Sequence, residues 1–153
     1  MYIIQHPEVK GDQNVGKFKD CFKVTAVDYN GGRETIQAPL GNSERPGRSP
    51  SYSEIKVTKL SCSASRALED SCNFGKLAEC KIYFLDSTNT EYLEITLTNA
   101  IFSNYQFRAH GGIPRESFDI AFSAIAKRHI PRDAKGLPGT PSSTTFNLTK
   151  MAR

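Results

Sequence analysis

A long run of alternating apolar and polar residues, from position 91 to position 108, constrains the fold of this chain more than any other feature. Its odd positions carry most of the aliphatic residues, such as Leu93 and Ile95, and its even positions are mainly polar. Period-two alternation is the signature of a strand with one face in a core. At ~3.3 Å per residue such a strand would exceed ~50 Å, so we expect one bend, near Asn99 or Ser103.

A second alternating segment follows a turn at Gly111-Gly112, with apolar even positions between Phe118 and Ala126. The two segments together predict an antiparallel hairpin. Similar patterns predict further strands at residues 2–5, 21–29, 52–60, 80–85 and 144–148. The 38% hydrophobic content is ordinary for a globular protein. We therefore predict a single, mainly β domain over residues 1–153, built as a small antiparallel β-barrel or two packed sheets.

One stretch has the spacing of a helix instead. Between Ser63 and Phe74 the apolar residues share one helical face (Ala64, Ala67, Leu68 and Cys72). Ser63 is expected to cap the start of this short helix, and Gly75 to end it.

Two segments look irregular. Residues 30–50 are rich in glycine and proline, and a loop of this length is usually functional or disordered. Residues 131–141 are similar, and they begin a basic C-terminal segment (131–153). From Lys127 onward there are six bases and one acid, so this part has a net charge of +5. The rest of the chain has a net charge of −1, which gives +4 for the whole. An acidic partner and a solubilising tail both explain such a segment.

Catalytic and metal-binding motifs are missing from the sequence. The histidines His6, His110 and His129 are scattered, and no phosphate loop, dinucleotide fingerprint or nucleophile elbow occurs. We therefore expect no enzyme activity, no cofactor and no metal, with a hydrolase assembled only in the fold as a remote option. The cysteines (Cys21, Cys62, Cys72 and Cys80) lack zinc-site spacing and are expected to be free thiols, although a disulfide among the last three stays open. The N-terminus does not resemble a signal peptide, and no apolar run could span a membrane, so we expect no membrane insertion.

Two aromatic residues on the polar face of the long strand, Tyr92 and Phe102, suggest nucleic-acid binding as an alternative function. Stacking aromatics and a basic C-terminus are typical of β-barrels that bind nucleic acid. The bases cluster in a segment rich in proline and glycine, however, and do not interleave with the aromatics. The sequence thus gives this alternative only weak support.

The chain as a whole resembles a known family. The resemblance is carried, in order, by residues 9–12, by Ser51-Tyr-Ser-Glu-Ile-Lys-Val-Thr-Lys59, by the helix with Ser65 and Leu68, by 101–106, Gly111-Gly112 and 114–122, and by Ile130-Pro-Arg-Asp-Ala-Lys-Gly136. Together these segments are similar to the haemolysin-coregulated proteins (Hcp), the tube subunits of the bacterial type VI secretion system. The family often has a tryptophan in its first strands, which this chain lacks, and residues 30–50 are hard to align.

The resemblance implies a homohexamer whose rings stack into a tube. The tube is expelled by a contractile sheath, meets spike and baseplate proteins, and can carry effector proteins in its lumen. The protein would be made in the bacterial cytoplasm and secreted without a cleaved signal peptide, and the chain has no room for an added toxin domain. The loop at 30–50 would help join one ring to the next, with Gly31, Gly32, Arg33, Arg45 and Arg48 as the candidate ring-stacking residues.

Overall fold

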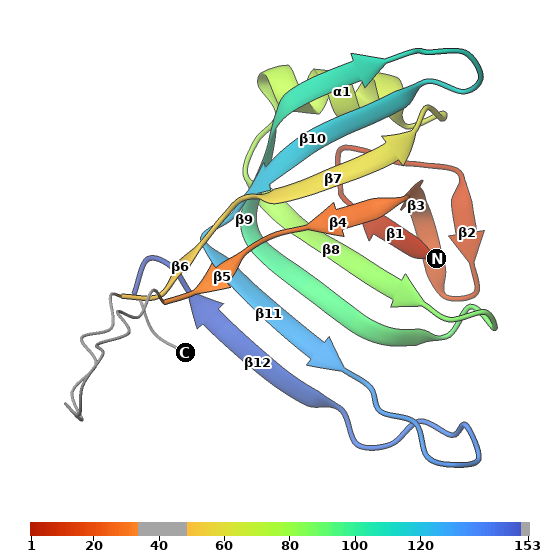
Figure 1. Ribbon diagram of the computed structural model, residues 1–153, viewed down its shortest axis with the longest axis vertical. Coiled ribbons are helices and arrows are strands. Elements are labelled where there is room, and N and C mark those ends of the chain that lie inside the picture. Colours follow the sequence, from red (N-terminus) through yellow and green to blue (C-terminus); the bar gives the residue numbers. More distant parts are fainter. Residues whose placement is uncertain (34–48, 151–153) are drawn as a thin grey trace, which may run out of the picture.

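The computed structural model describes residues 1–33 and 49–150 and confirms a mainly β fold with one short helix. Figure 1 shows a curled sheet with the helix against one end. The elements are β1 (Tyr2–Gln5), β2 (Gln13–Val15), β3 (Phe18–Val24), β4 (Ala26–Asp28), β5 (Gly31–Gly32), β6 (Ser51–Tyr52), β7 (Ile55–Leu60), α1 (Ser65–Phe74), β8 (Ala78–Leu85), β9 (Glu91–Arg108), β10 (Arg115–Ala121), β11 (Ala124–His129) and β12 (Ser142–Asn147).

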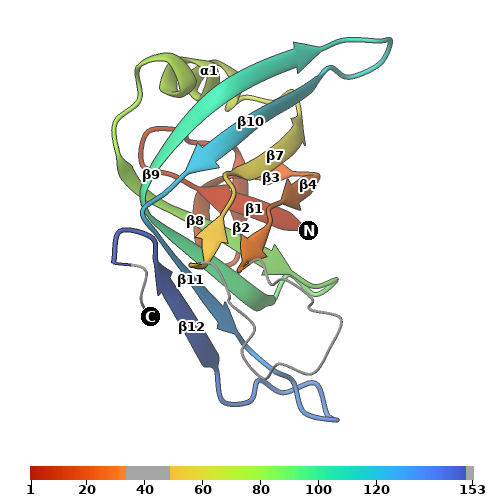
Figure 2. The ribbon, with the colours of Figure 1, turned by 60° about the vertical axis from the view of Figure 1, so that its left-hand side comes forward.

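The main sheet has ten strands, and all of its neighbouring pairs run antiparallel. The hydrogen-bonded order is β2-β3-β1-β8-β9-β10-β7-β4, and β11 and β12 extend from β9. The two sides of this path meet again because β3 and β4 are consecutive in the chain. At their junction, the backbone N–H and the hydroxyl of Thr25 donate to the carbonyl of Thr58, at 2.8 and 3.0 Å. The sheet therefore curls into a barrel-like body around its core (Figure 2).

β9 is the spine of the sheet, and it is irregular at two places where the sequence predicted one bend. Asn99 and Asn104 have positive φ values of 50° and 51°. Near each of them the register with a neighbouring strand shifts, because β9 contributes one extra residue. The extra residue moves the following side chains to the opposite face, so that Leu97 and Ala100 are both buried. Phe102 is only 2% exposed, and its predicted place on the polar face is therefore wrong.

Three other predicted strands are divided in the structure, and the one predicted at 52–60 becomes β6 and β7. The predicted strand at 21–29 becomes β3 and β4, with Thr25 between them. The segment after Gly112 becomes β10, which pairs with the C-terminal half of β9, and β11, which pairs with its N-terminal half. Ser123 lies between them, and its backbone N–H donates to the carbonyl of Thr98 at 3.0 Å. The pairing of both parts with β9 fits the predicted antiparallel hairpin.

α1 lies where the spacing predicted a helix, but its N-terminus differs from the prediction. Ala64 is the N-cap residue and no side chain caps the helix, so the prediction of Ser63 as the cap is wrong. The Ser65 hydroxyl instead accepts the N–H of Cys62 at 2.9 Å. Gly75 ends the helix as expected, and its N–H donates to the carbonyl of Ser71. A Cβ at Gly75 would collide with that carbonyl oxygen.

A buried polar network joins α1 to the sheet. Lys59 on β7 and Glu116 on β10 form an ion pair at 2.5 Å, with 0% and 1% of their side chains exposed. Tyr105 and Ser65 donate their hydroxyl groups to the same carboxylate, at 2.5 and 2.7 Å. Burial alone would raise the pKa of Glu116, but the hydrogen bonds from Lys59, Tyr105 and Ser65 outweigh it and hold the pKa below its usual value. The network fixes four elements, β7, α1, β9 and β10, relative to one another.

Candidate assembly surface

The candidate ring-stacking residues begin in the two-stranded ribbon of β5 and β6. Gly31 pairs with Tyr52 and Gly32 with Ser51, and Arg33 follows as an exposed residue. A Cβ at Gly31 would collide with the ring of Tyr52, so this glycine allows the ring to lie against the backbone. The other two candidates, Arg45 and Arg48, lie outside the described residues. The structure therefore places Gly31, Gly32 and Arg33 together at the base of the predicted loop.

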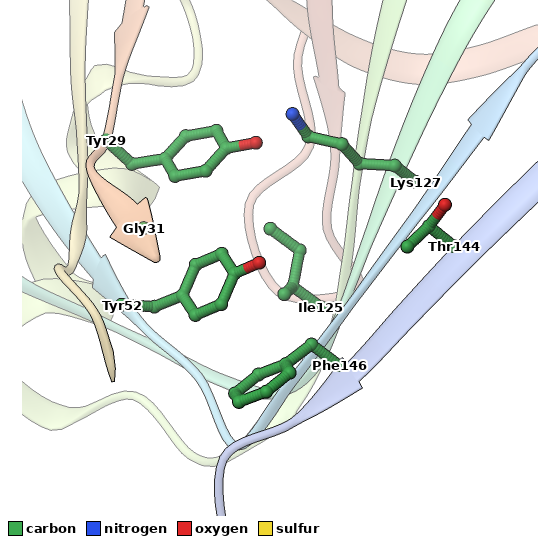
Figure 3. Close-up of a pocket in the computed structure, with 7 residues that line it drawn as sticks. All are labelled: Tyr29, Gly31, Tyr52, Ile125, Lys127, Thr144 and Phe146. Carbon is green, nitrogen blue, oxygen red and sulfur yellow. The ribbon is translucent and has the colours of Figure 1, made fainter. Parts of the chain in front are cut away.

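The ribbon forms one wall of a cleft of about 470 Å³, which we call the aromatic cleft (Figure 3). Its opposite wall is formed by β11 and β12. Two directly paired positions of these strands, Ile125 with Phe146 and Lys127 with Thr144, face the cleft. The residues that line it are Tyr29, Gly31, Tyr52, Ile125, Lys127, Thr144 and Phe146. A volume of this size is typical of clefts that bind ligands or protein side chains.

Three aromatic rings make up most of the cleft. The Tyr52 ring lies between those of Tyr29 and Phe146, with centroid separations of 6.3 and 5.0 Å. The Tyr29–Tyr52 pair is stacked, and the Tyr52–Phe146 pair is tilted. All three rings pack on the core only in part, so one side of each remains open toward the cleft.

The cleft also carries one positive charge. The Lys127 ammonium lies 4.8 Å from the centroid of the Tyr29 ring, in a cation–π contact. Within residues 1–33 and 49–150 no carboxylate lies within ion-pair distance of it, and the hydroxyls of Tyr29 and Tyr52 have no hydrogen-bond partner. Aromatic walls with one cation suit an apolar or aromatic group that has a carboxylate nearby.

No local sequence pattern predicts that the residues of the aromatic cleft would meet. The three aromatic residues are far apart along the chain. Tyr29 and Tyr52 lie at the ends of two predicted strands, and Phe146 lies inside a third. They come together only because the ribbon folds over β11 and β12, and this long-range arrangement is not encoded in local alternation.

β12 forms a free edge beside the cleft. In the part of the chain that the structure describes, it pairs with β11 alone. Its residues from Ser142 to Thr145 are exposed and polar. An unpaired strand edge is a surface on which another chain can add.

The basic C-terminal segment is part of the fold rather than a loose tail. Arg128 lies 3.3 Å from both Glu91 and Glu94, and Arg132 lies 2.9 Å from Asp86. The segment after β11 is a compact turn in which the Asp133 carboxylate accepts the N–H groups of residues 135 and 137. Of the six bases from Lys127 onward, two, Arg128 and Arg132, are neutralised in this way.

Buried cysteines and histidines show no catalytic arrangement. The four cysteines are free thiols in the structure. Burial, helped by a nearby carboxylate in each case, raises the pKa of Cys21 and of Cys72 to about 11, and burial raises that of Cys80 further. His6 is buried against Phe102, at a centroid distance of 4.5 Å. Among the described residues, no group of three or more His, Cys, Asp or Glu side chains could hold a metal ion.

Comparison with known proteins identifies the family. The family model described as "Type VI secretion system effector, Hcp" matches residues 3–129. The chain belongs to the Hcp family. The resemblance found in the sequence is therefore confirmed.

Solved structures of other proteins share the fold at low identity. A type six secretion system protein superposes with a TM-score of 0.88 at 21% identity, covering 97% of this chain and 96% of that one. Hcp1 from Salmonella typhimurium has a TM-score of 0.76 at 15% identity, with 97% and 95% covered. A type VI secretion system effector from Yersinia pestis has a TM-score of 0.72 at 16% identity, with 96% and 99% covered. No curated protein sequence matches this chain.

As an Hcp protein, the chain is a subunit of the type VI secretion tube, a structural protein that is secreted and self-assembles. Nothing in the described part of the chain favours the nucleic-acid alternative, because Phe102 is buried and two of the C-terminal bases, Arg128 and Arg132, are ion-paired. Within the described residues, no helix is both long and apolar enough to cross a membrane.

Proposed function

We propose that this Hcp protein forms homohexameric rings that stack into the inner tube of a type VI secretion system. A contractile sheath expels the tube, spike and baseplate proteins meet its ends, and effector proteins travel in its lumen. The match of residues 3–129 to the Hcp family carries this proposal. The protein acts as one domain, is made in the bacterial cytoplasm, and leaves through the tube machinery.

Native mass spectrometry and negative-stain microscopy of the purified chain test the ring. We expect a species of six subunits and rings of six-fold symmetry at micromolar concentration. A protein that stays monomeric at the highest soluble concentration would contradict the proposal.

Ring stacking is assigned to Gly31, Gly32, Arg33, Arg45 and Arg48. The described members of this set support the assignment, because they are exposed and lie at the end of a ribbon that leaves the sheet. Replacing Arg33, Arg45 and Arg48 together by serine is expected to leave the rings intact and to shorten or abolish the tubes seen by microscopy. Loss of the rings themselves would assign these residues to subunit contacts within the ring.

We infer that the protein performs no catalysis of its own. The buried Lys59–Glu116 pair supports this, since both groups are engaged in hydrogen bonds and the Ser65 hydroxyl of α1 binds both of them. Measured hydrolysis of generic ester, peptide and phosphate substrates should equal the buffer rate. A rate that depends on protein concentration and survives repeated purification would refute this inference.

A further inference from the structure

An exposed aromatic patch lies at the C-terminal end of α1, which we call the helix-end patch (Glu8, Asp70 and Phe74). Phe74 is 86% exposed, the largest exposure of any large hydrophobic residue in the described part of the chain. Asp70 lies one turn before it on the same face of the helix, because residues four apart are neighbours on a helix. Glu8 lines the same shallow hollow. The exposed ring and the two carboxylates together form a surface that an apolar cleft with a positive charge would complement.

The patch carries a negative charge that the fold does not neutralise. Within residues 1–33 and 49–150, neither Glu8 nor Asp70 lies within ion-pair distance of a base. Phe74 makes no aromatic pair with another described ring. Among the described residues, the Phe74 ring and the two carboxylates are therefore free to meet a partner.

The aromatic cleft has the complementary properties. It offers three partly open rings, from Tyr29, Tyr52 and Phe146, to an entering ring. Its charge is positive, from Lys127 in the cleft and from the exposed Arg33 beside the ribbon. A phenylalanine side chain fits within about 470 Å³, and a carboxylate one helical turn away would lie near the ammonium group.

The two surfaces lie at different ends of the molecule. In both Figure 1 and Figure 2, α1 is at the upper end, whereas the β5–β6 ribbon and β12 are lower. One copy cannot place its own helix end in its own cleft, but one copy can place it in the cleft of the next. Such a contact joins different patches of identical chains, and head-to-tail contacts of this kind generate rings when the rotation closes.

We propose that the helix-end patch of one subunit docks in the aromatic cleft of a second copy of this chain. Phe74 packs against the open sides of the Tyr52 and Phe146 rings, and Asp70 pairs with Lys127. This inference rests on the proposed ring and names the surfaces that join its neighbours.

Surface substitutions test the contact without disturbing the fold. Phe74→Ala and Asp70→Lys alter exposed side chains, and Lys127→Glu alters an exposed side chain of the cleft. We expect Phe74→Ala to raise the protein concentration at half assembly by at least about tenfold, as for a central aromatic contact. Mass photometry and size-exclusion chromatography with light scattering measure it. Phe107→Ala, at another exposed phenylalanine on the β9–β10 hairpin, is the matched control and should assemble as the wild type does.

Charge reversal and mixing give two sharper readouts. Asp70→Lys and Lys127→Glu should each weaken assembly, and the chain that carries both should regain it. In a mixture of Asp70→Lys and Lys127→Glu, opposite charges meet at both contacts between the two variants, so this mixture should form rings. The head-to-tail direction is tested by mixing Phe74→Ala, which keeps its cleft, with Tyr52→Ala, which keeps its helix end. An equimolar mixture of these two should form dimers and no rings.

The outcomes separate this inference from the proposed function. Rings that form equally well with Phe74→Ala and Asp70→Lys would overturn the docking contact and leave the ring proposal standing. Failure of the double charge reversal to restore rings lost by both single variants would overturn the Asp70–Lys127 pairing. A wild-type chain that forms no rings would contradict the proposed function itself. Circular dichroism of each variant confirms that it is folded.

Discussion

At the scale of single residues, the buried Lys59–Glu116 pair is the most consequential feature. Neither charge reaches water, and Tyr105 and Ser65 supply the remaining hydrogen bonds to the carboxylate. Removing one member of a buried ion pair is strongly destabilising because the other charge is left uncompensated. The sequence could not reveal this pair, since Lys59 and Glu116 occupy strands that become neighbours only in the folded sheet.

Glu116→Gln should lower the free energy of unfolding by about 3–5 kcal/mol, because the Lys59 ammonium stays buried without its partner. Urea denaturation followed by circular dichroism measures the change. Glu54→Gln, at an exposed position near the start of β7, is the control and should stay within about 0.5 kcal/mol of the wild type. A Glu116 variant as stable as the control would show that the pair adds nothing to the fold.

The same carboxylate predicts how stability depends on pH. Its pKa is lower in the folded protein than in the unfolded chain, where it is about 4.3. Its contribution is therefore fully present above the unfolded pKa and is lost as the pH falls through the folded pKa. We expect the urea midpoint of the wild type to fall more steeply below about pH 4.3 than that of Glu116→Gln. Parallel curves for the two proteins would contradict this assignment.

At the scale of elements, alternation predicted the strands well where each strand keeps one face in the core. It failed in β9, where the buried positions change from odd numbers, ending at Leu97, to even numbers, beginning at Ala100 and Phe102. Local sequence gives the period but not the phase after a bulge, because the phase depends on which strands pair on each side. The asparagines that adopt positive φ were the available signal, since asparagine tolerates that conformation better than most residues.

Asn99→Val should destabilise the protein by about 1–3 kcal/mol, because a β-branched residue is strained at a φ of 50°. The substitution also removes the hydrogen bond from the Asn99 amide to the Ser123 hydroxyl, at 3.2 Å. Asn99→Gly is the control, since glycine adopts this φ freely and loses only that hydrogen bond. Thermal unfolding of both variants measures the difference, and equal losses would mean that backbone strain plays no part.

At the scale of the whole molecule, the seam at Thr25 is what makes a curled body from an open sheet. The family and the general architecture could be predicted from the ordered set of strand and turn motifs. The aromatic cleft could not, because its walls come from residues near positions 30, 50, 125 and 145, and no local pattern relates them. The candidate ring-stacking residues were predicted from the resemblance alone, and their role stays a prediction.

Thr25→Pro should lower the free energy of unfolding by at least about 2 kcal/mol, because it removes both donors to the Thr58 carbonyl. Thr25→Val keeps the backbone donor and should cost about 1 kcal/mol. Amide hydrogen exchange provides a second readout, since opening the seam should speed exchange in β4 and β7. Equal effects of the two substitutions would show that the backbone bond at the seam is unimportant.

The 18-residue span of β9 also has a consequence for synthesis on the ribosome. One edge of β1 stays unpaired until β8 has been synthesised. β8 is connected to β10 and β7 only through β9, which is synthesised later than β8. The first two-thirds of the nascent chain therefore leaves the exit tunnel with open strand edges, which are prone to pair wrongly. A ribosome-bound chain that stops before Arg108 should be captured by chaperones, and one that extends past β11 should be released from them.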